Sequence, residues 1–380
     1  MTKSNSTYQI CAQCVMDTVG NPEITFDDKG ICNYCYEYQE KASIRLFDRD
    51  DERKTAMDQL IDRIKSSGES KPYDCLIGVS GGVDSTYTAY LVKQLGLRPL
   101  AVHFDNGWNS ELAVSNIEKI LDNLGIDLHT FVVDWEEFKD LQLSFLKAST
   151  PDGEIPTDHA ILSTLYSTAS KFGIKYIISG NNFKTEGVMP RLWAYGHIDW
   201  KYIRNVHKRF GTKRLKTFPH LSLAKFVWYT FIKRVKLVSI LNYTDYDRES
   251  AMKLLIDKLE WQYYGGKHYE SNYTKFYQGY ILPEKFKIDK RKLHLSAYIL
   301  AGLKSRQEAL EELKAPIYPP ERIAEDTEYI IKKFDIPDEV FNDIMQATPK
   351  TFLDYPTNYP LHSKLRNFLS TLRSKGLYHR

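Results

Sequence analysis

Apolar and polar positions follow two different rhythms along the middle of the chain. Short apolar runs bounded by turn residues are typical of buried strands, and amphipathic segments with helical spacing fill the gaps between them. The expected strands are 75–80, 99–104, 128–133 and 175–179, and the expected helices are 84–96, 111–124, 135–148 and 158–172. Apolar strands separated by amphipathic helices predict an α/β fold, a doubly wound parallel sheet with helices on both faces.

Ligands of such sheets bind at the carboxyl ends of the strands, so the residues that end each expected strand are the functional candidates. The first strand ends in Ser80-Gly81-Gly82-Val83-Asp84-Ser85. A strand, a glycine turn and a helix aim backbone N–H groups and a positive helix end at one point, which suits a pyrophosphate. The glycines permit close backbone approach, the two hydroxyls add donors, and Asp84 is a candidate Mg²⁺ ligand.

This loop is not a Walker A loop, since no Lys follows the glycines, and the third glycine of the dinucleotide-binding pattern is missing. The alternative is a plain strand-to-helix turn. The second strand ends in His103-Phe104-Asp105, where a plain turn is again the alternative, and the fourth ends in Gly180-Asn181-Asn182. Asp158, at the start of an expected helix, either serves as a helix N-terminal charge or faces the site.

Two CxxC pairs stand near the N-terminus, Cys11 with Cys14 and Cys32 with Cys35, with 17 residues between the pairs. This spacing predicts four thiolates around a structural Zn²⁺ in a small ribbon, with a redox dithiol pair as the alternative. Such a closed site has no open position for catalysis. Because the segment buries little core of its own, metal binding would supply its folding energy.

The composition is that of an ordinary soluble globular protein, with 27% charged and 42% apolar residues. At 380 residues, one large domain with appendages or two domains are expected. The N-terminus lacks an apolar signal region, and no run of about 18 apolar residues occurs, so a cytoplasmic protein is expected. Five cysteines in such a chain indicate metal binding or catalysis rather than disulfides.

Residues 184–236 are strongly basic, with 13 Lys and Arg against 2 acidic residues, Glu186 and Asp199. A basic, aromatic stretch suits RNA, an anionic nucleotide-sugar or an acidic lipid surface, or it forms a solvated face. Within it, residues 221–241 are apolar but interrupted by lysines. We expect either core packing with solvated lysines or an amphipathic helix at a membrane surface.

A glycine pair, Gly265-Gly266, precedes Lys267, His268 and Glu270, with Lys275 behind. Lys, His and Glu at close spacing indicate a site for a polyanion and for proton transfer, although a charged loop would look the same. The remainder, residues 296–380, has helical patterns interrupted by prolines and no evident chemistry of its own.

The SGGVDS loop resembles that of the PP-loop ATP pyrophosphatases, HUP-like enzymes that cleave ATP between its α and β phosphates. Over nearly the whole chain, the motifs resemble one branch, the N-acetyl sugar amidotransferases of surface-polysaccharide biosynthesis. The matching segments are the four cysteines, SGGVDS at 80–85, HFDNGW at 103–108, GNN at 180–182 and GGKHYES…TKFYQGYILPEKF at 265–286 with the following KLHLS.

The resemblance implies that ATP adenylates the acetamido oxygen of a nucleotide-activated N-acetyl sugar and that ammonia displaces AMP to leave an acetamidino group. The product would serve lipopolysaccharide O-antigen or a related glycan. Since the chain shows no glutaminase signature, the family implies ammonia from a separate glutaminase with a cyclase-like subunit. No nucleic-acid partner is implied, and peripheral membrane contact stays open.

The implied cofactors are ATP, Mg²⁺ and structural Zn²⁺. Asp84 would bind Mg²⁺, and Lys267 would stabilise charge on the adenylate with Glu270 and Lys275 nearby. The remaining residues would contact ATP: Ser80, Gly81, Gly82, Val83 and Ser85 its pyrophosphate, His103, Phe104 and Asp105 its adenine, and Gly180, Asn181 and Asn182 its phosphates.

The expected division of the chain is a zinc ribbon at 1–45, a helical connector at 46–72, a PP-loop core at 73–185, a basic, aromatic region at 186–300 that completes the site, and a helical tail at 301–380. The main rival function is a PP-loop tRNA-modifying enzyme, a thiolase or a lysidine-synthetase-like enzyme. Only Cys75 is spare for sulfur transfer, which argues against a thiolase. A second rival is a zinc-ribbon protein that senses ATP without catalysis.

Overall fold

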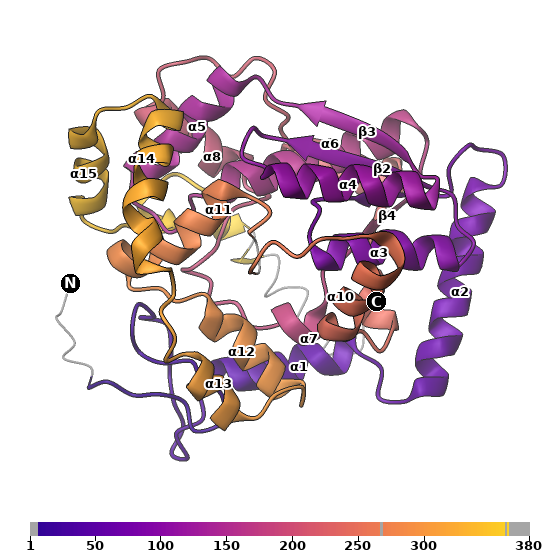
Figure 1. The fold of residues 1–380 in the computed structure, drawn as a ribbon, viewed down its shortest axis with the longest axis horizontal. Helices are drawn as coiled ribbons and strands as arrows, with labels where there is room; N and C mark the ends of the chain where they lie inside the picture. Colours follow the sequence, from indigo (N-terminus) through magenta and orange to yellow (C-terminus); the bar gives the residue numbers. More distant parts are fainter. Residues whose placement is uncertain (1–6, 267–268, 362, 365–380) are drawn as a thin grey trace.

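The computed structural model describes residues 7–266, 269–361, 363 and 364. Its centre is a five-stranded sheet in the order β3-β2-β1-β4-β5, in which every pair of neighbours is parallel (Figure 1). The strands are β1 (Cys75–Gly78), β2 (Pro99–Asp105), β3 (Asp127–Val132), β4 (Tyr176–Ser179) and β5 (Lys236–Ser239). The doubly wound α/β fold expected from the sequence is confirmed.

Helices cover both faces of the sheet because successive strand side chains point to opposite sides. Leu76 and Ile177 pack with Leu165 of α6 (Ile155–Lys171), whereas Ile77 and Ile178 belong to a separate core on the opposite face. That second core is shared with α3 (Val83–Gln94), α4 (Glu111–Leu124) and α10 (Arg248–Leu259). The uninterrupted apolar strand runs therefore reflect burial on both faces.

Most boundaries lie within two residues of the sequence expectation, and two elements differ more. Helix α6 begins at Ile155 rather than at residue 158, because Pro156 occupies the first turn, where its missing N–H costs nothing. Strand β5 was not expected. It lies at the edge of the sheet, paired with β4 alone, so it needs no apolar run, and Lys236 and Leu237 are exposed.

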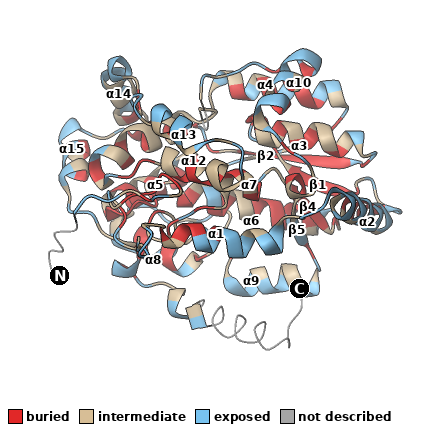
Figure 2. Cartoon of the chain, turned by 90° about the horizontal axis from the view of Figure 1, so that it is seen from below, coloured by how far each residue is buried: buried red, intermediate tan, exposed pale blue. Residues whose placement is uncertain are grey.

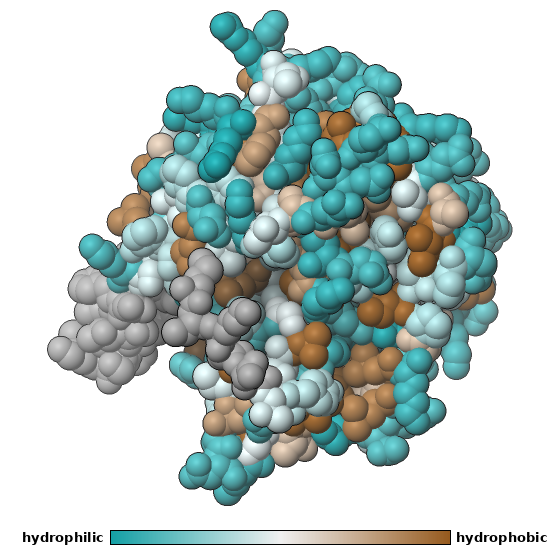
Figure 3. All heavy atoms as spheres, turned by 90° about the vertical axis from the view of Figure 1, so that its left-hand side faces the viewer, coloured by the Kyte–Doolittle hydropathy of each residue, from teal (hydrophilic) through white to brown (hydrophobic). Residues whose placement is uncertain are grey.

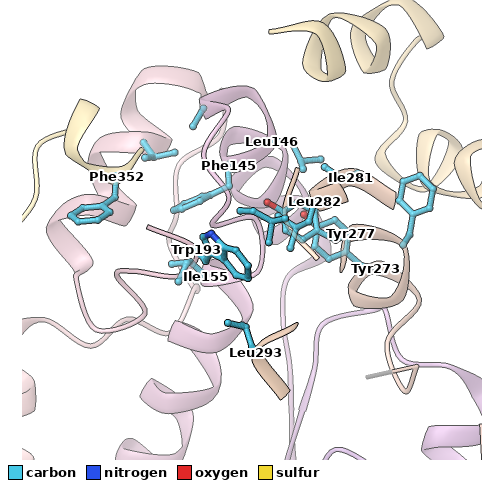
Figure 4. Packing of buried hydrophobic residues seen from close by; sticks show 14 of the residues in the cluster. Phe145, Leu146, Ile155, Trp193, Tyr273, Tyr277, Ile281, Leu282, Leu293 and Phe352 are labelled. Atoms are coloured by element: carbon cyan, nitrogen blue, oxygen red, sulfur yellow. The ribbon is translucent and has the colours of Figure 1, made fainter. Parts of the chain in front are cut away.

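The remaining chain is mainly helical and builds a further large core beside the sheet, separate from the two cores on its faces. Figure 4 shows part of this core, in which Trp193, Tyr277, Leu293 and Phe352 converge from distant parts of the sequence. Its α-helices are α1 (Asn33–Arg45), α5 (Trp135–Ala148), α7 (Phe183–Glu186), α8 (Trp200–Phe210), α11 (Asn272–Phe276), α12 (Arg291–Leu300), α14 (Ile323–Phe334) and α15 (Asp338–Gln346). The N-terminal cysteines and the C-terminal helices thus share one core.

Outside this core, α2 (Asp50–Gly68) packs against the sheet core, and α13 (Arg306–Glu312) and α9 (Leu223–Val227) lie at the periphery. Two π-helical turns, Trp228–Ile232 and Tyr277–Phe286, continue α9 and α11. Short 3₁₀ turns occupy Ile240–Tyr243, Pro320–Arg322 and Phe352–Asp354.

The face that carries α14 and α15, turned to the viewer in Figure 3, is mostly hydrophilic, with hydrophobic side chains in scattered groups. Within the described residues, none of the helices combines the length and the apolar character that crossing a membrane requires.

Candidate active site and metal centre

Three loops meet at the carboxyl ends of adjacent strands β2, β1 and β4. The chain runs from β1 to β2 on one side and later returns to β4 on the other side of β1. The order of strands therefore reverses between β1 and β4, the position at which doubly wound sheets bind their ligands.

Gly81 is the one position in the loop after β1 where only glycine fits. Its φ of +80° lies in the left-handed region, and a Cβ there would stand 2.6 Å from the backbone oxygen of Ala113. The Trp261 indole N–H donates to the Gly81 carbonyl oxygen at 3.0 Å. The glycine turn is thus clamped between α4 and the segment after α10.

The hydroxyls of Ser80 and Ser85 lie together at the N-terminus of α3, with 3.1 Å between the two oxygens. The Ser80 N–H donates to the Ser85 hydroxyl oxygen at 3.2 Å, and the Gly82 N–H points at the Ser80 oxygen at 3.4 Å. Val83 starts the helix with its side chain buried. Hydroxyl and N–H donors at a helix N-terminus are the groups that bind a phosphate.

Asp84 is half-buried in the first turn of α3, and its carboxylate accepts a hydrogen bond from the Tyr246 hydroxyl. Burial, with the nearby Asp84 charge, raises the pKa of Tyr246, so this phenol remains a donor. Tyr246 thereby fixes one carboxylate oxygen. The Asp84 side chain fits the role of a Mg²⁺ ligand, since carboxylate oxygens at such a loop are the donors this ion prefers.

The loop after β4 lies directly against the first turn of α3, which carries Asp84. A Cβ on Gly180 would stand 2.8 Å from the Asp84 backbone oxygen and 3.0 Å from the Ser85 nitrogen. Asn181 is exposed, whereas Asn182 is buried and caps α7 by accepting from the Thr185 N–H at 3.0 Å. Gly180 therefore contacts the loop after β1, Asn181 beside it is open to solvent, and the Asn182 side chain serves the fold.

The side chains at the end of β2 are largely engaged within the fold. The Asn109 amide donates to His103 Nε2 at 3.1 Å, which puts the His103 proton on Nδ1, where it is donated to the Val79 carbonyl oxygen at 3.0 Å. Phe104 is buried and stacks on Phe131. The groups of this strand end that can contact a ligand are its backbone groups and the Asp105 carboxylate. This carboxylate accepts from the Gly107 N–H.

The segment after α10 reaches the nucleotide loop through Tyr264 and Glu270. A Cβ on Gly82 would stand 3.2 Å from the Tyr264 hydroxyl and 3.4 Å from Glu270 Oε1. Burial first, and then the nearby Glu270 charge, raises the pKa of Tyr264. The Glu270 carbonyl oxygen accepts from the Ser110 N–H at 2.9 Å, which anchors the segment to the start of α4.

Lys275 lies on α11, and its ammonium group is 5.7 Å from the ring centre of Tyr269, the neighbour of Glu270. The same ammonium group pairs with Asp326 on α14 at 3.0 Å and lies 5.4 Å from the Tyr318 ring centre. Asp158 is an exposed residue in the first turn of α6. Lys267 and His268 lie outside the described residues.

Three residues at the site were not anticipated: Tyr246, Trp261 and Tyr264. They stand about 160 or more positions after the glycine loop. From the sequence alone, aromatic residues there would be assigned to the hydrophobic core. The cluster of aromatics just before Gly265-Gly266 was a signal for Tyr264. Tyr246 offered none.

Cys11, Cys14, Cys32 and Cys35 form a fully buried cluster. The Cys11–Cys35, Cys14–Cys32 and Cys32–Cys35 sulfur pairs are 3.7, 3.6 and 3.7 Å apart. Tetrahedral Zn²⁺ with Zn–S bonds of about 2.3 Å places its sulfurs about 3.8 Å apart. The spacing therefore fits a zinc tetrahedron, and none of the four cysteines forms a disulfide.

The surroundings of the sulfurs also suit thiolates. The N–H groups of Gln13, Cys14 and Cys32 donate to Cys11 Sγ at 3.4, 3.4 and 3.2 Å. Arg306 of α13 donates to the carbonyl oxygens of Cys11 and Cys14 at 2.8 and 3.0 Å. Donors to sulfur offset the negative charge of a thiolate cluster, so this cluster is a candidate structural zinc site.

Comparison with known proteins gives partial relatives. The tRNA-specific 2-thiouridylase of Fusobacterium nucleatum is 25% identical over 140 residues, which cover 35% of this chain and 38% of the relative. That of Sulfurimonas denitrificans is 30% identical over 123 residues, covering 30% and 35%. The chain thus spans little more than a third of the length of these curated relatives.

Among solved structures, the chain is similar to the NH₃-dependent NAD synthetase of Campylobacter jejuni, with a TM-score of 0.30 and 16% identity over 70% of this chain and 97% of that one. The NMN synthetase of Francisella tularensis gives a TM-score of 0.28 at 16% identity, covering 48% and 71%.

Residues 270–367 match the family model of the LPS biosynthesis protein WbpG-like C-terminal domain. The match begins at Glu270, the residue whose carboxylate lies on the glycine loop. This match agrees with the resemblance to the surface-polysaccharide branch: residues 270–367 are similar to a WbpG-like C-terminal domain.

Proposed function

We propose that this protein is an ATP-dependent, AMP-forming amidotransferase that acts on an N-acetyl sugar in lipopolysaccharide-related synthesis. One observation carries the proposal. The WbpG-like domain begins at Glu270, and Glu270 lies on Gly82 of the glycine loop. A domain named for LPS biosynthesis and an ATP-type phosphate loop therefore build one site.

The chemistry requires activation because the oxygen of an amide is a poor leaving group. The acetamido oxygen attacks the α-phosphorus of ATP and pyrophosphate leaves. Ammonia then adds to the activated carbon, and AMP leaves with the former acetamido oxygen. The product is an acetamidino group, in which NH replaces O, so atoms balance without any redox partner.

The described residues have distinct roles in this proposal. The Ser80 and Ser85 hydroxyls and the N–H groups at the start of α3 would hold pyrophosphate. Asp84 would hold Mg²⁺, which would neutralise phosphate charge. Glu270, whose carboxylate lies beside Gly82 as the Ser80 hydroxyl does, is suited to accept a proton from the incoming ammonia.

Ammonia would come from a separate glutaminase with a cyclase-like subunit, and the substrate would be a nucleotide-activated sugar in the cytoplasm. All five cysteines are buried, four of them in the metal cluster and Cys75 inside β1. An internal glutaminase of the cysteine type needs an accessible thiolate, so this observation supports an external ammonia source.

The test is mass spectrometry of nucleotide-activated N-acetyl sugars after incubation with the protein, ATP, Mg²⁺ and high ammonium salt. The expected result is the mass decrease for replacement of O by NH, with AMP and pyrophosphate formed in equal amounts. The Asp84→Asn variant is the control. AMP formation that is independent of every sugar in the panel would contradict the proposal.

The local similarity to tRNA-specific 2-thiouridylases favours a second candidate, a tRNA-modifying enzyme. Against its sulfur-transfer form, burial raises the pKa of the Cys75 thiol, which has no exposure at all. If tRNA rather than a sugar stimulates AMP release, the second candidate replaces the first.

A further inference from the structure

The segment after α8 has two distinct sides. Leu221 and Val235 are buried, and Phe226 and Tyr229 pack against Tyr166 of α6 with ring centres 5.7 and 6.0 Å apart. These four residues attach α9 and the following π-helical turn to the body of the protein.

The opposite side of the same segment carries large hydrophobic side chains in solvent. Phe231 and Ile232 are 69% and 68% exposed, and Trp228 is 42% exposed. We call the outward-facing set the apolar patch; its members are Leu223, Val227, Trp228, Phe231 and Ile232. In Figure 2, α9 lies on the outside of the molecule below α6, with exposed and intermediate residues along it.

The turn of the helical segment decides which of its side chains face solvent. Helical spacing places residues 223, 227 and 231 on one side, whereas residues 226 and 229 lie on the other. Several large apolar side chains exposed on one short segment mark a candidate binding surface.

The charged residues of the segment that carries the patch are all basic. From residue 200 to residue 244 the sequence contains no Asp or Glu. Lys225, Arg234 and Lys236 are exposed beside the patch, and the Lys233 ammonium lies 4.8 Å from the Trp228 ring centre. A surface that accepts this patch must therefore be apolar in its interior and anionic at its boundary.

We propose that the apolar patch docks the protein on an anionic lipid surface. Phe231 and Ile232 would enter the acyl-chain boundary, Trp228 would lie at the headgroup level, and the lysines and arginine would contact anionic headgroups. RNA matches the charge but not Leu223, Val227 and Ile232, because aliphatic side chains offer no stacking surface to bases. The proposal is independent of the reaction catalysed.

Trp228 provides a direct readout. It is the exposed one among the six tryptophans, all of which lie within the described residues. Vesicles of phosphatidylglycerol with brominated phosphatidylcholine should quench the fluorescence of the full-length protein, and pure brominated phosphatidylcholine should quench it far less. The Trp228→Phe variant should lose most of the quenching while still sedimenting with the anionic vesicles.

Two further variants separate the contributions. Phe231→Ser with Ile232→Ser should weaken sedimentation at least about tenfold, because two large apolar groups no longer leave water. Lys225→Gln with Arg234→Gln should weaken it about tenfold at low salt. Val132→Ser with Leu353→Ser, which alters two exposed hydrophobics elsewhere, should bind as the unaltered protein does.

Retained ATP–pyrophosphate exchange and an unchanged melting temperature would show that the Phe231 and Ile232 variant is folded, and with lost sedimentation they support the docking site. Equal sedimentation with neutral and anionic vesicles, or none with either, would overturn the proposal. A concentration-dependent dimer that disappears in the Phe231 and Ile232 variant would also overturn it. So would tRNA binding, without vesicle binding, that disappears in that variant.

Discussion

Asp84 and Gly81 depend on residues far away in the sequence for their conformation. Tyr246 donates to the Asp84 carboxylate, and Trp261 donates to the Gly81 carbonyl. A side chain that is already held in place loses little freedom when a ligand binds, and preorganised groups contribute most where charge develops in a reaction. At the scale of single residues, the site is preorganised before any ligand binds.

Asp84→Asn should reduce ATP–pyrophosphate exchange by at least about a hundredfold, because the amide lacks the charge that a Mg²⁺ ligand needs. The fold should be unaffected, since Asn still accepts from Tyr246. The measurement is exchange of labelled pyrophosphate, with the exposed α4 variant Asp122→Asn as the matched control. Unchanged exchange in the Asp84 variant would show that this carboxylate is not a Mg²⁺ ligand.

Asp152 links stability to pH. Its carboxylate is buried, accepts from the Tyr195 N–H at 3.0 Å and lies 3.0 Å from the Tyr202 hydroxyl. Burial raises the pKa of Asp152 to about 7. The folded protein keeps this proton up to about pH 7, whereas the unfolded chain releases it near pH 3.9, so the stability it contributes is present below about pH 4 and lost as the pH rises to about 7.

Asp152→Asn should therefore stabilise the protein above pH 7, by up to a few kcal/mol at about 1.4 kcal/mol per pKa unit, because Asn resembles the neutral acid and does not ionise. Urea unfolding at pH 5 and pH 8 measures this. The gain over the unaltered protein should be larger at pH 8. An equal change in the free energy of unfolding at both values would mean that Asp152 titrates normally in the fold.

At the scale of elements, the site depends on two loops in contact. Gly180, after β4, approaches the Asp84 backbone so closely that a Cβ has no room. Because β1 and β4 are neighbours in the sheet, their following loops are held at a fixed separation by the strand hydrogen bonds. The loop after β4 therefore acts as a rigid support for the start of α3.

Gly180→Ala should displace the start of α3, with a loss of about 1–3 kcal/mol in stability and at least about tenfold in pyrophosphate exchange. Gly78→Ala in β1 is the matched control, since its Cβ would meet Leu165 at an ordinary 3.5 Å. The comparison uses thermal melting and exchange rates. A Gly180 variant as active as the Gly78 variant would show that the two loops move independently.

At the scale of the whole molecule, the first and last parts of the chain are joined around the cysteine cluster. Arg306 donates to the Cys11 and Cys14 carbonyls, the Val15 N–H donates to Ser296 at 3.3 Å, and Lys292 pairs with Asp17 at 2.5 Å. These residues stand close to 300 positions apart in sequence. Metal binding at the N-terminus should therefore stabilise the C-terminal helices as well.

Cys14→Ser should abolish stoichiometric zinc, measured by metal analysis, and lower the melting temperature, because zinc binding is a large part of the folding free energy of such clusters. Cys75→Ala, which alters the buried cysteine of β1, should keep the zinc. A Cys14 variant that retains both zinc and melting temperature would show that the cluster is not the metal site.

Local patterns along the chain determined the strands, the helices that alternate with them, the glycine loop and the cysteine cluster. These features are encoded by spacing within a few residues, or within one small ribbon, so periodicity and turn chemistry suffice to find them. Nearly all of the central sheet was predicted in this way. Strand β5 was missed because it is short and lies inside the apolar, lysine-interrupted stretch 221–241, whose pattern does not separate a strand from a helix.

The partners of the functional side chains were decided by the tertiary structure. The sequence does not show that Tyr246 holds Asp84, that Lys275 pairs with Asp326, or that His103 binds the Val79 carbonyl. Likewise, the apolar residues at 223–232 suited either core or surface, and only the packing of Phe226 and Tyr229 on Tyr166 turned their neighbours outward. Such contacts join residues far apart in sequence, so they depend on the path of the whole chain and not on any local pattern.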